Sequence, residues 1–125
     1  MADFVAALQC FDPAEHSKCC RQLAARCYDS KDFQTVVAQN ALIFECLQEL
    51  LMPVHRSPSS DEVKVAVCSA LVAMTFQCEE AKEMSVKVGT VLRVLRCVMK
   101  SEDEAVIQEG CCLVGNLTAS FGTFA

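Results

Sequence analysis

Two stretches of the chain, residues 63–75 and 106–118, align without a gap and limit the possible folds more than any other feature of the sequence. They are 43 residues apart and agree in residue type at Val63/Val106, Cys68/Cys111, Leu71/Val114, Met74/Leu117 and Thr75/Thr118. Their apolar members recur at the spacing that gathers side chains on one face of a helix. The alignment therefore predicts a chain built from a repeated helical unit.

Composition favours an all-α fold and limits the classes of function. The 125 residues are 53% hydrophobic and 22% charged, which excludes a disordered chain, and four Gly and three Pro leave few residues for the turns of an all-β fold. A net charge of −5 argues against nucleic-acid binding, which needs clustered Lys and Arg. No apolar run reaches the roughly 20 residues that span a bilayer, and no export signal is present, so we expect a cytoplasmic protein without membrane contact.

Apolar periodicity and helix-capping residues predict eight helices. Phe11, Val36 and Leu42 are expected to face inward, Asn40 to end a helix, and Gly89 to break one. Residues 53–60, rich in Pro and Ser, are expected to form a loop, in which Ser57 before Pro58 is a candidate for phosphorylation. The predicted helices cover residues 2–11, 14–28, 30–38, 41–52, 62–76, 79–87, 91–99 and 106–118.

The ten cysteines are interpreted as reduced thiols that pack as small hydrophobic residues. Most of them fall within apolar helical patterns, whereas disulfide-rich secreted chains are rich in loops. His16, Cys19 and Cys20 have the i, i+3, i+4 spacing of zinc ligands, but no second pair of ligands follows, so no metal site is predicted. A nucleophilic Cys needs a base, and only His16 and His55 are available. We therefore expect no enzyme activity, cofactor or small-molecule substrate.

The last repeat resembles the third helix of an armadillo repeat. The residues that carry the resemblance are Val106, Glu109, Gly110, Cys111, Val114, Asn116 and Leu117, and the sequence from Glu79 to Lys82 with Val88 and Gly89 is similar to the family's first helix and its glycine. The resemblance implies one domain that forms a right-handed α-solenoid of about two and a half units. The approximate units are residues 1–28 (partial), 29–76 and 77–118. HEAT repeats share the stacking principle and are the alternative.

The resemblance also implies a function. Armadillo proteins bind extended peptides along a concave surface of third helices, with asparagines holding the peptide backbone and tryptophans forming side-chain pockets. Asn116 matches such an asparagine, Ala73 occupies the same place in the preceding unit, and Ser69 and Cys112 occupy tryptophan positions. The chain is thus expected to be a non-enzymatic scaffold or adaptor that binds other proteins. The predicted contact residues are Arg21, Ser69, Ala73, Cys112 and Asn116.

The end of the chain suggests an alternative. Terminal units of a solenoid normally present a polar face, whereas the last helix offers apolar residues that we expect to be exposed. The alternative reading is a structural domain that associates with itself as a homo-oligomer, or an N-terminal fragment of a longer helical-repeat protein. The predicted self-association residues are Leu113, Leu117, Phe121 and Phe124.

Overall fold

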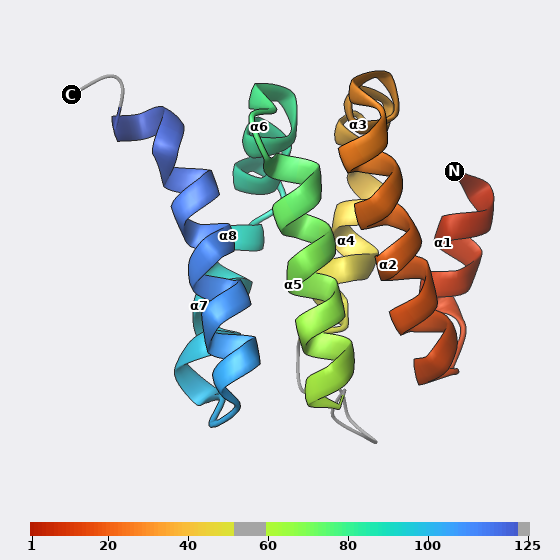
Figure 1. Ribbon diagram of the computed structural model, residues 1–125, viewed down its shortest axis with the longest axis vertical. Coiled ribbons are helices and arrows are strands. Elements are labelled where there is room, and N and C mark those ends of the chain that lie inside the picture. The colour runs from red at the N-terminus through yellow and green to blue at the C-terminus, as the bar shows by residue number, and fades with distance from the viewer. Residues whose placement is uncertain (52–59, 123–125) are drawn as a thin grey trace.

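The computed structural model describes residues 1–51 and 60–122, and the side chains of the last helix as far as residue 118. The described residues form eight α-helices and no strand, which confirms the all-α prediction (Figure 1). The helices are α1 (Ala2–Gln9), α2 (Pro13–Asp29), α3 (Lys31–Ala38), α4 (Ala41–Glu49), α5 (Asp61–Thr75), α6 (Glu79–Lys87), α7 (Thr90–Lys100) and α8 (Glu104–Gly122).

Each long helix packs against its counterpart one unit further along the chain. In Figure 1, α2, α5 and α8 form a row, with α4 and α7 behind it and α1 at the N-terminal end. The most extensive contacts join α2 to α5 and α5 to α8, and further contacts join α3 to α6 and α4 to α7. The helices are thus arranged in successive layers, α2–α4 followed by α5–α7 and then α8, with α5 between α2 and α8.

The 43-residue spacing is also visible in the first turns of α5 and α8. Ser60 Oγ accepts a hydrogen bond from the backbone N–H of Val63, and Asp103 Oδ1 accepts one from the N–H of Val106. Each cap satisfies a donor that the first helical turn leaves without a partner. The same 43 residues therefore separate the caps, the starts of the helices and the aligned apolar positions.

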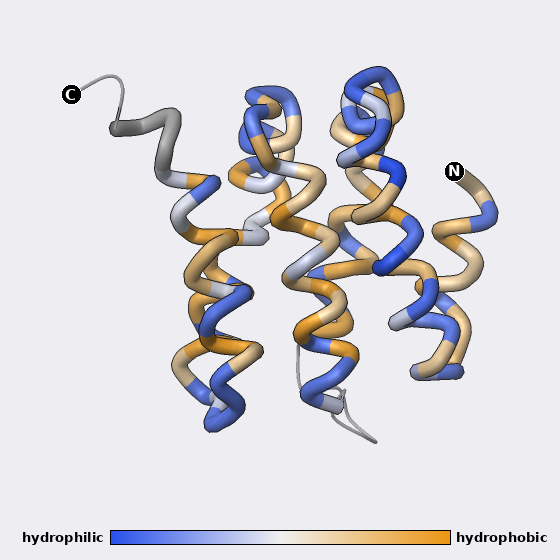
Figure 2. Tube along the Cα trace, in the orientation of Figure 1, coloured by the Kyte–Doolittle hydropathy of each residue, from blue (hydrophilic) through white to orange (hydrophobic). Residues whose placement is uncertain are grey.

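The core is centred on α5, whose hydrophobic residues run along the helix between its two neighbours (Figure 2). The six residues expected to be buried in this helix are all buried, and each Val, Leu or Met side chain among them contributes on the order of 1.5–3 kcal/mol relative to an exposed one. They are Val63, Val67, Cys68, Ala70, Leu71 and Met74.

Two buried glutamines that periodicity did not predict tie successive layers together. Gln34 Nε2 in α3 donates to the carbonyl oxygens of Ala73 and Phe76, each at 2.9 Å, at the C-terminal end of α5. Gln48 Nε2 in α4 donates to Val88 O at 2.8 Å, and its Oε1 accepts from the Thr90 hydroxyl at 2.7 Å. Both side chains thus satisfy polar groups where other helices begin or end.

Four expectations about individual residues are wrong. Phe11 lies beyond the end of α1 and is fully exposed, because the chain turns toward the α2 cap at Asp12. Val36 and Leu42 face solvent, since their helices bury the neighbouring Val37 and Ile43 instead. Asn40 does not end α3 in a left-handed conformation.

Asn40 instead caps α4, with φ −102°, and its side chain accepts from the backbone N–H of Ile43. The helix that follows ends at Glu49 rather than residue 52. Gly89, by contrast, separates α6 from α7 as expected, and its backbone is left-handed there, with φ +79° at the start of α7. Residues 53–59 of the predicted loop, including the modification candidate Ser57, lie outside the described part, and its last residue, Ser60, caps α5.

Candidate functional site

A hollow of about 340 Å³ lies between α2 and α5, and two of the predicted contact residues, Arg21 and Ser69, line it. Its other lining residues are Cys20, Ala24, Glu62, Val65 and Ala66. Small side chains from both helices leave this space, while Arg21 and Glu62 place opposite charges at its exposed edge. The α2–α5 hollow therefore offers an apolar floor with polar groups beside it.

An aromatic pair extends the same side of the two helices. The rings of Tyr28 and Phe76 have centroids 6.4 Å apart, and the side chains are 60% and 48% exposed. Tyr28 is seven residues after Arg21 in α2, and Phe76, the first residue after α5, is seven residues after Ser69, so each aromatic lies about two turns beyond a residue that lines the hollow. Together with the hollow, these two rings form what we call the α2–α5 surface.

The aromatic pair was missed in the sequence, although a signal for it exists. Tyr28 and Phe76 lie next to the C-terminal ends of α2 and α5 and are 48 residues apart, just as the caps Asp12 and Ser60 are 48 apart. Aligning the first unit by its cap would have placed both rings on the third-helix face.

The structure does not bring the remaining predicted contact residues onto this surface. Ala73 is fully buried and so has no surface with which to contact a partner directly. Asn116 Nδ2 donates to Val72 O at 3.1 Å and lies 3.5 Å from Thr75 Oγ1, so its amide joins α8 to α5. Cys112 is exposed on α8, one unit away from the hollow.

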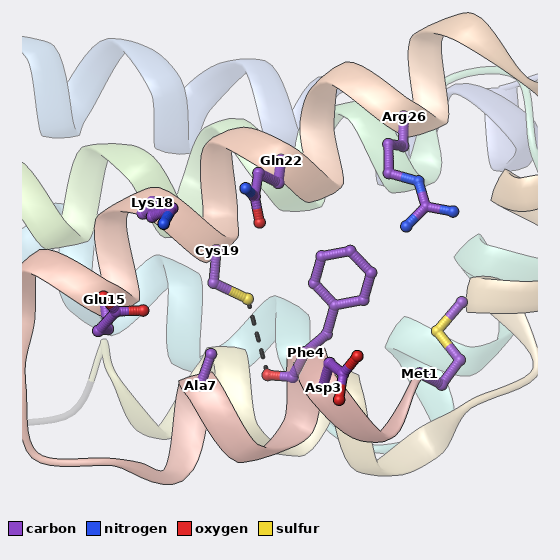
Figure 3. A pocket seen from close by; sticks show the side chains of 9 residues that line it. All are labelled: Met1, Asp3, Phe4, Ala7, Glu15, Lys18, Cys19, Gln22 and Arg26. Atoms are coloured by element: carbon purple, nitrogen blue, oxygen red, sulfur yellow. Dashed lines mark hydrogen bonds between the residues drawn. The ribbon is translucent and has the colours of Figure 1, made fainter.

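A second hollow, of about 360 Å³, lies between α1 and α2 and has a mixed charged lining (Figure 3). The Cys19 thiol donates to Phe4 O at 3.6 Å in its wall. The Arg26 guanidinium lies 4.1 Å from the ring centroid of Phe33 and 5.5 Å from that of Phe4. These cation–π contacts hold α1 against α2 and α3, so we interpret this hollow as the seam of a helix contact.

Burial sets the character of the core thiols. It raises the pKa of the Cys20 and Cys68 thiols to about 12, and that of the Cys19 and Cys27 thiols to about 11. A thiolate is the reactive form, so these four groups are poor nucleophiles and poor metal ligands at neutral pH. Cys111 and Cys112, expected to pack, are instead exposed.

The suspected zinc ligands have other partners. The His16 ring nitrogen Nε2 lies 2.6 Å from Cys10 O, and the Cys19 thiol is the donor to Phe4 O described above. Across residues 1–51 and 60–122, no three His, Cys, Asp or Glu side chains are placed to hold a metal ion together.

The predicted self-association residues are not available as a group. Leu113 and Leu117 are buried, because they face the interior beside α5 and α7 rather than the open end of α8. Phe121 and Phe124 lie outside the residues whose side chains are described. The expectation that Leu113 and Leu117 are exposed is therefore wrong.

Comparison with protein families, curated proteins and solved structures finds no match to this chain. Within the part that the structure describes, no helix combines the length and apolar character needed to cross a bilayer.

Proposed function

We propose that this chain is a non-enzymatic protein-interaction module of the armadillo type, and that the α2–α5 surface binds a segment of a partner protein. The observation that carries the proposal is an apolar hollow in line with an exposed aromatic pair. Aromatic and Arg side chains are enriched where proteins bind one another, and interface anchors usually fill pockets of this kind. The layered contacts of α2, α5 and α8 support the armadillo-type arrangement.

The lining of the hollow favours a particular kind of contact. Ala24, Val65 and Ala66 suit an apolar side chain of the partner, and Arg21 and Glu62 suit polar groups on either side of it. Asn116 is engaged with α5, and Ala73 replaces the other asparagine, so a ladder of asparagines along the peptide backbone does not form here. Side-chain burial, rather than backbone hydrogen bonding, is therefore the proposed source of affinity.

Site-specific photocrosslinking tests the proposal. A photoreactive amino acid at Ser69 should capture a defined partner in native extract, whereas the same residue at the exposed Glu45 of α4 should not capture it. The double substitution Tyr28→Ala and Phe76→Ala should weaken binding of the captured partner by roughly tenfold or more, since each ring is an interface anchor. The matched control is Val86→Ala, which removes an exposed apolar side chain from α6.

Two results would overturn the proposal. One is equal capture of the partner from Ser69 and from Glu45, which would show that the partner does not bind preferentially at the α2–α5 surface. The other is unchanged affinity in the double variant while its thermal unfolding remains that of the wild type.

A further inference from the structure

The side of α8 that faces away from α5 repeats a helix face that is buried one layer earlier. Cys68, Leu71 and Thr75 of α5 have no exposed surface, and they lie on the helix that packs against α8. Their counterparts 43 residues later are Cys111, Val114 and Thr118. Of these, Cys111 and Thr118 are exposed and Val114 is only half-buried. The stacking face is thus present on α8, and no helix among the residues that the structure describes covers it.

The neighbouring side of α7 is apolar as well. Leu92, Leu95 and Met99 are 56%, 40% and 82% exposed, and their i, i+3, i+7 spacing places them on one stripe. They lie opposite Thr90, which meets Gln48 of α4, so the stripe points away from the preceding layer. We call the two stripes together the end face, made of Leu92, Leu95 and Met99 on α7 and Ile107, Cys111, Val114 and Thr118 on α8.

We propose that a second copy of this chain covers the end face, with a two-fold axis that lies between the copies and runs along the helices. Such an axis makes the interface isologous and places α7 of each copy over α8 of the other. This inference concerns a different surface from the α2–α5 surface and does not rest on the proposed function.

Side-chain size and charge both favour this pairing. The α7 stripe is made of large residues, whereas Cys111 and Thr118 on the α8 stripe are small, so side chains of one fit between those of the other. The helix α7 carries Arg93, Arg96 and Lys100, of which Arg93 donates to Val88 O at the end of α6. On α8, Glu104 is exposed on the same side as Ile107 and Cys111, whereas Glu109 lies near Cys68 of α5. Placing α7 over α7 would instead bring two basic helices together.

The symmetry also fixes which residues meet. A two-fold rotation about an axis parallel to the helices does not change the height of a residue along that axis. Two residues that lie at the same height within one copy therefore also lie at the same height across the interface. Val98 of α7 contacts Gly110 of α8, and the helices run in opposite directions. Leu95 of the second copy therefore lies between Cys111 and Val114.

The other end of the stack does not offer a competing site. There α1 already covers α2, with Phe4 and Leu8 buried, and the exposed residues of α1 are Ala2, Asp3, Ala6 and Gln9. A head-to-tail contact would bury these small and polar residues against the apolar end face. The same face on a second copy is the better complement that this chain provides.

Sedimentation velocity of the full chain under reducing conditions is the first test. We expect a reversible monomer–dimer equilibrium, and Leu95→Glu should raise the dimer Kd by at least about 100-fold, because the symmetry places the substitution in the interface twice. Leu42→Glu is the matched control, since Leu42 is an exposed leucine on α4, outside the end face. A wild-type chain that stays monomeric up to about 200 μM, weaker than typical non-obligate complexes, would overturn the proposal, as would an unchanged Kd in Leu95→Glu.

Adjacent cysteines provide a second test in the unmodified protein. Cys111 lies on the end face, whereas Cys112 is rotated about 100° around α8. In pulsed alkylation read by mass spectrometry, Cys111 should become protected as protein concentration rises, while Cys112 keeps its rate. Equal rates at all concentrations contradict a dimer through this face. Protection of Cys111 in dilute monomer also contradicts it, because a second copy is then not what covers the thiol.

Discussion

At the scale of single residues, two buried glutamines hold the layers in register, and neither belongs to the apolar pattern of the sequence. Gln34 is the clearer case, because its one amide nitrogen lies within hydrogen-bond distance of three carbonyl oxygens at the end of α5. Those carbonyls would otherwise be left without intrahelical partners. The Gln34 side chain therefore satisfies the carbonyl groups at the C-terminal end of α5, as a capping residue would, although it lies 39 to 42 residues away from them in the sequence.

Replacing Gln34 by Leu should lower the free energy of unfolding by about 2 kcal/mol, because it leaves buried carbonyl groups without a donor. The measurement is urea unfolding followed by circular dichroism. Gln22→Leu, at an exposed position in α2, should change stability by less than about 0.5 kcal/mol. Equal effects from the two substitutions would show that the Gln34 contacts contribute nothing to stability.

Buried thiols predict a loss of stability in alkali. Burial raises the pKa of Cys20 and Cys68 in the folded state to about 12, above the ordinary value of 9.0. Between these values the unfolded chain gives up thiol protons that the folded chain retains, so stability is full below about pH 9 and falls as the pH rises toward 12.

Urea unfolding at pH 7 to 10.5 under reducing conditions measures this loss, and the double substitution of Cys20 and Cys68 by Ala should reduce its slope. The same substitutions at exposed Cys111 and Cys112 are the control and should leave the slope unchanged. If the double substitution of Cys20 and Cys68 also leaves the slope unchanged, other groups are responsible for the loss of stability in alkali.

At the scale of helices, α7 and α8 approach closely because Gly110 has no side chain. A Cβ at this position would overlap Cγ2 of Val98, whose β-branched side chain has little freedom to move aside. Gly115, five residues later on the same helix, has open space where its Cβ would be. One helix therefore contains a glycine required by packing and a glycine that packing does not require.

Gly110→Ala should destabilise the chain by roughly 1–3 kcal/mol through overpacking, whereas Gly115→Ala should stabilise it by up to about 1 kcal/mol, because Ala is the better helix former. Differential scanning calorimetry of the two variants at low protein concentration provides the comparison. A gain in stability at Gly110 would mean that α7 shifts away from α8 without cost.

The sequence predicted the central helix best and the outer surfaces least well. All six residues expected in the core of α5 are buried, because that helix has neighbours on both sides and few of its apolar residues can be exposed. Val36 and Leu42 were wrongly expected to be buried. Their helices are covered on one side only, so an apolar residue can lie on the covered side or on the exposed side. For the same reason Leu113 and Leu117 were wrongly expected to be exposed, although they lie on the covered side of α8.

The candidate site was predicted only in part. Arg21 and Ser69 do line one hollow, since positions that match between successive units fall on the same side of the stack. The hollow itself depends on how closely α2 approaches α5, and periodicity carries no information about that distance. Gln34 and Gln48 were not found either, because the groups they bond lie 39 to 42 residues away.

At the scale of the whole molecule, stacking means that stability is shared unequally among the layers. The helix α5 contacts α2 on one side and α8 on the other, and it also meets α3, α4 and α6. The helix α1 has eight residues, two of them buried, and contacts only α2 and α4 extensively. A helix this short has little stability of its own in water, so α1 depends on those contacts.

Hydrogen exchange should therefore be graded along the chain, with α1 amides exchanging at least about tenfold faster than those of α5 in native buffer. Leu8→Ala should speed exchange in α1 and leave α5 unaffected, since it loosens only the outermost layer. Leu71→Ala should speed both, because removing a fully buried side chain from the central helix weakens every contact that the stack shares. If Leu8→Ala accelerates α5 as much as α1, the chain unfolds as one cooperative unit, and the layers have no separate stability.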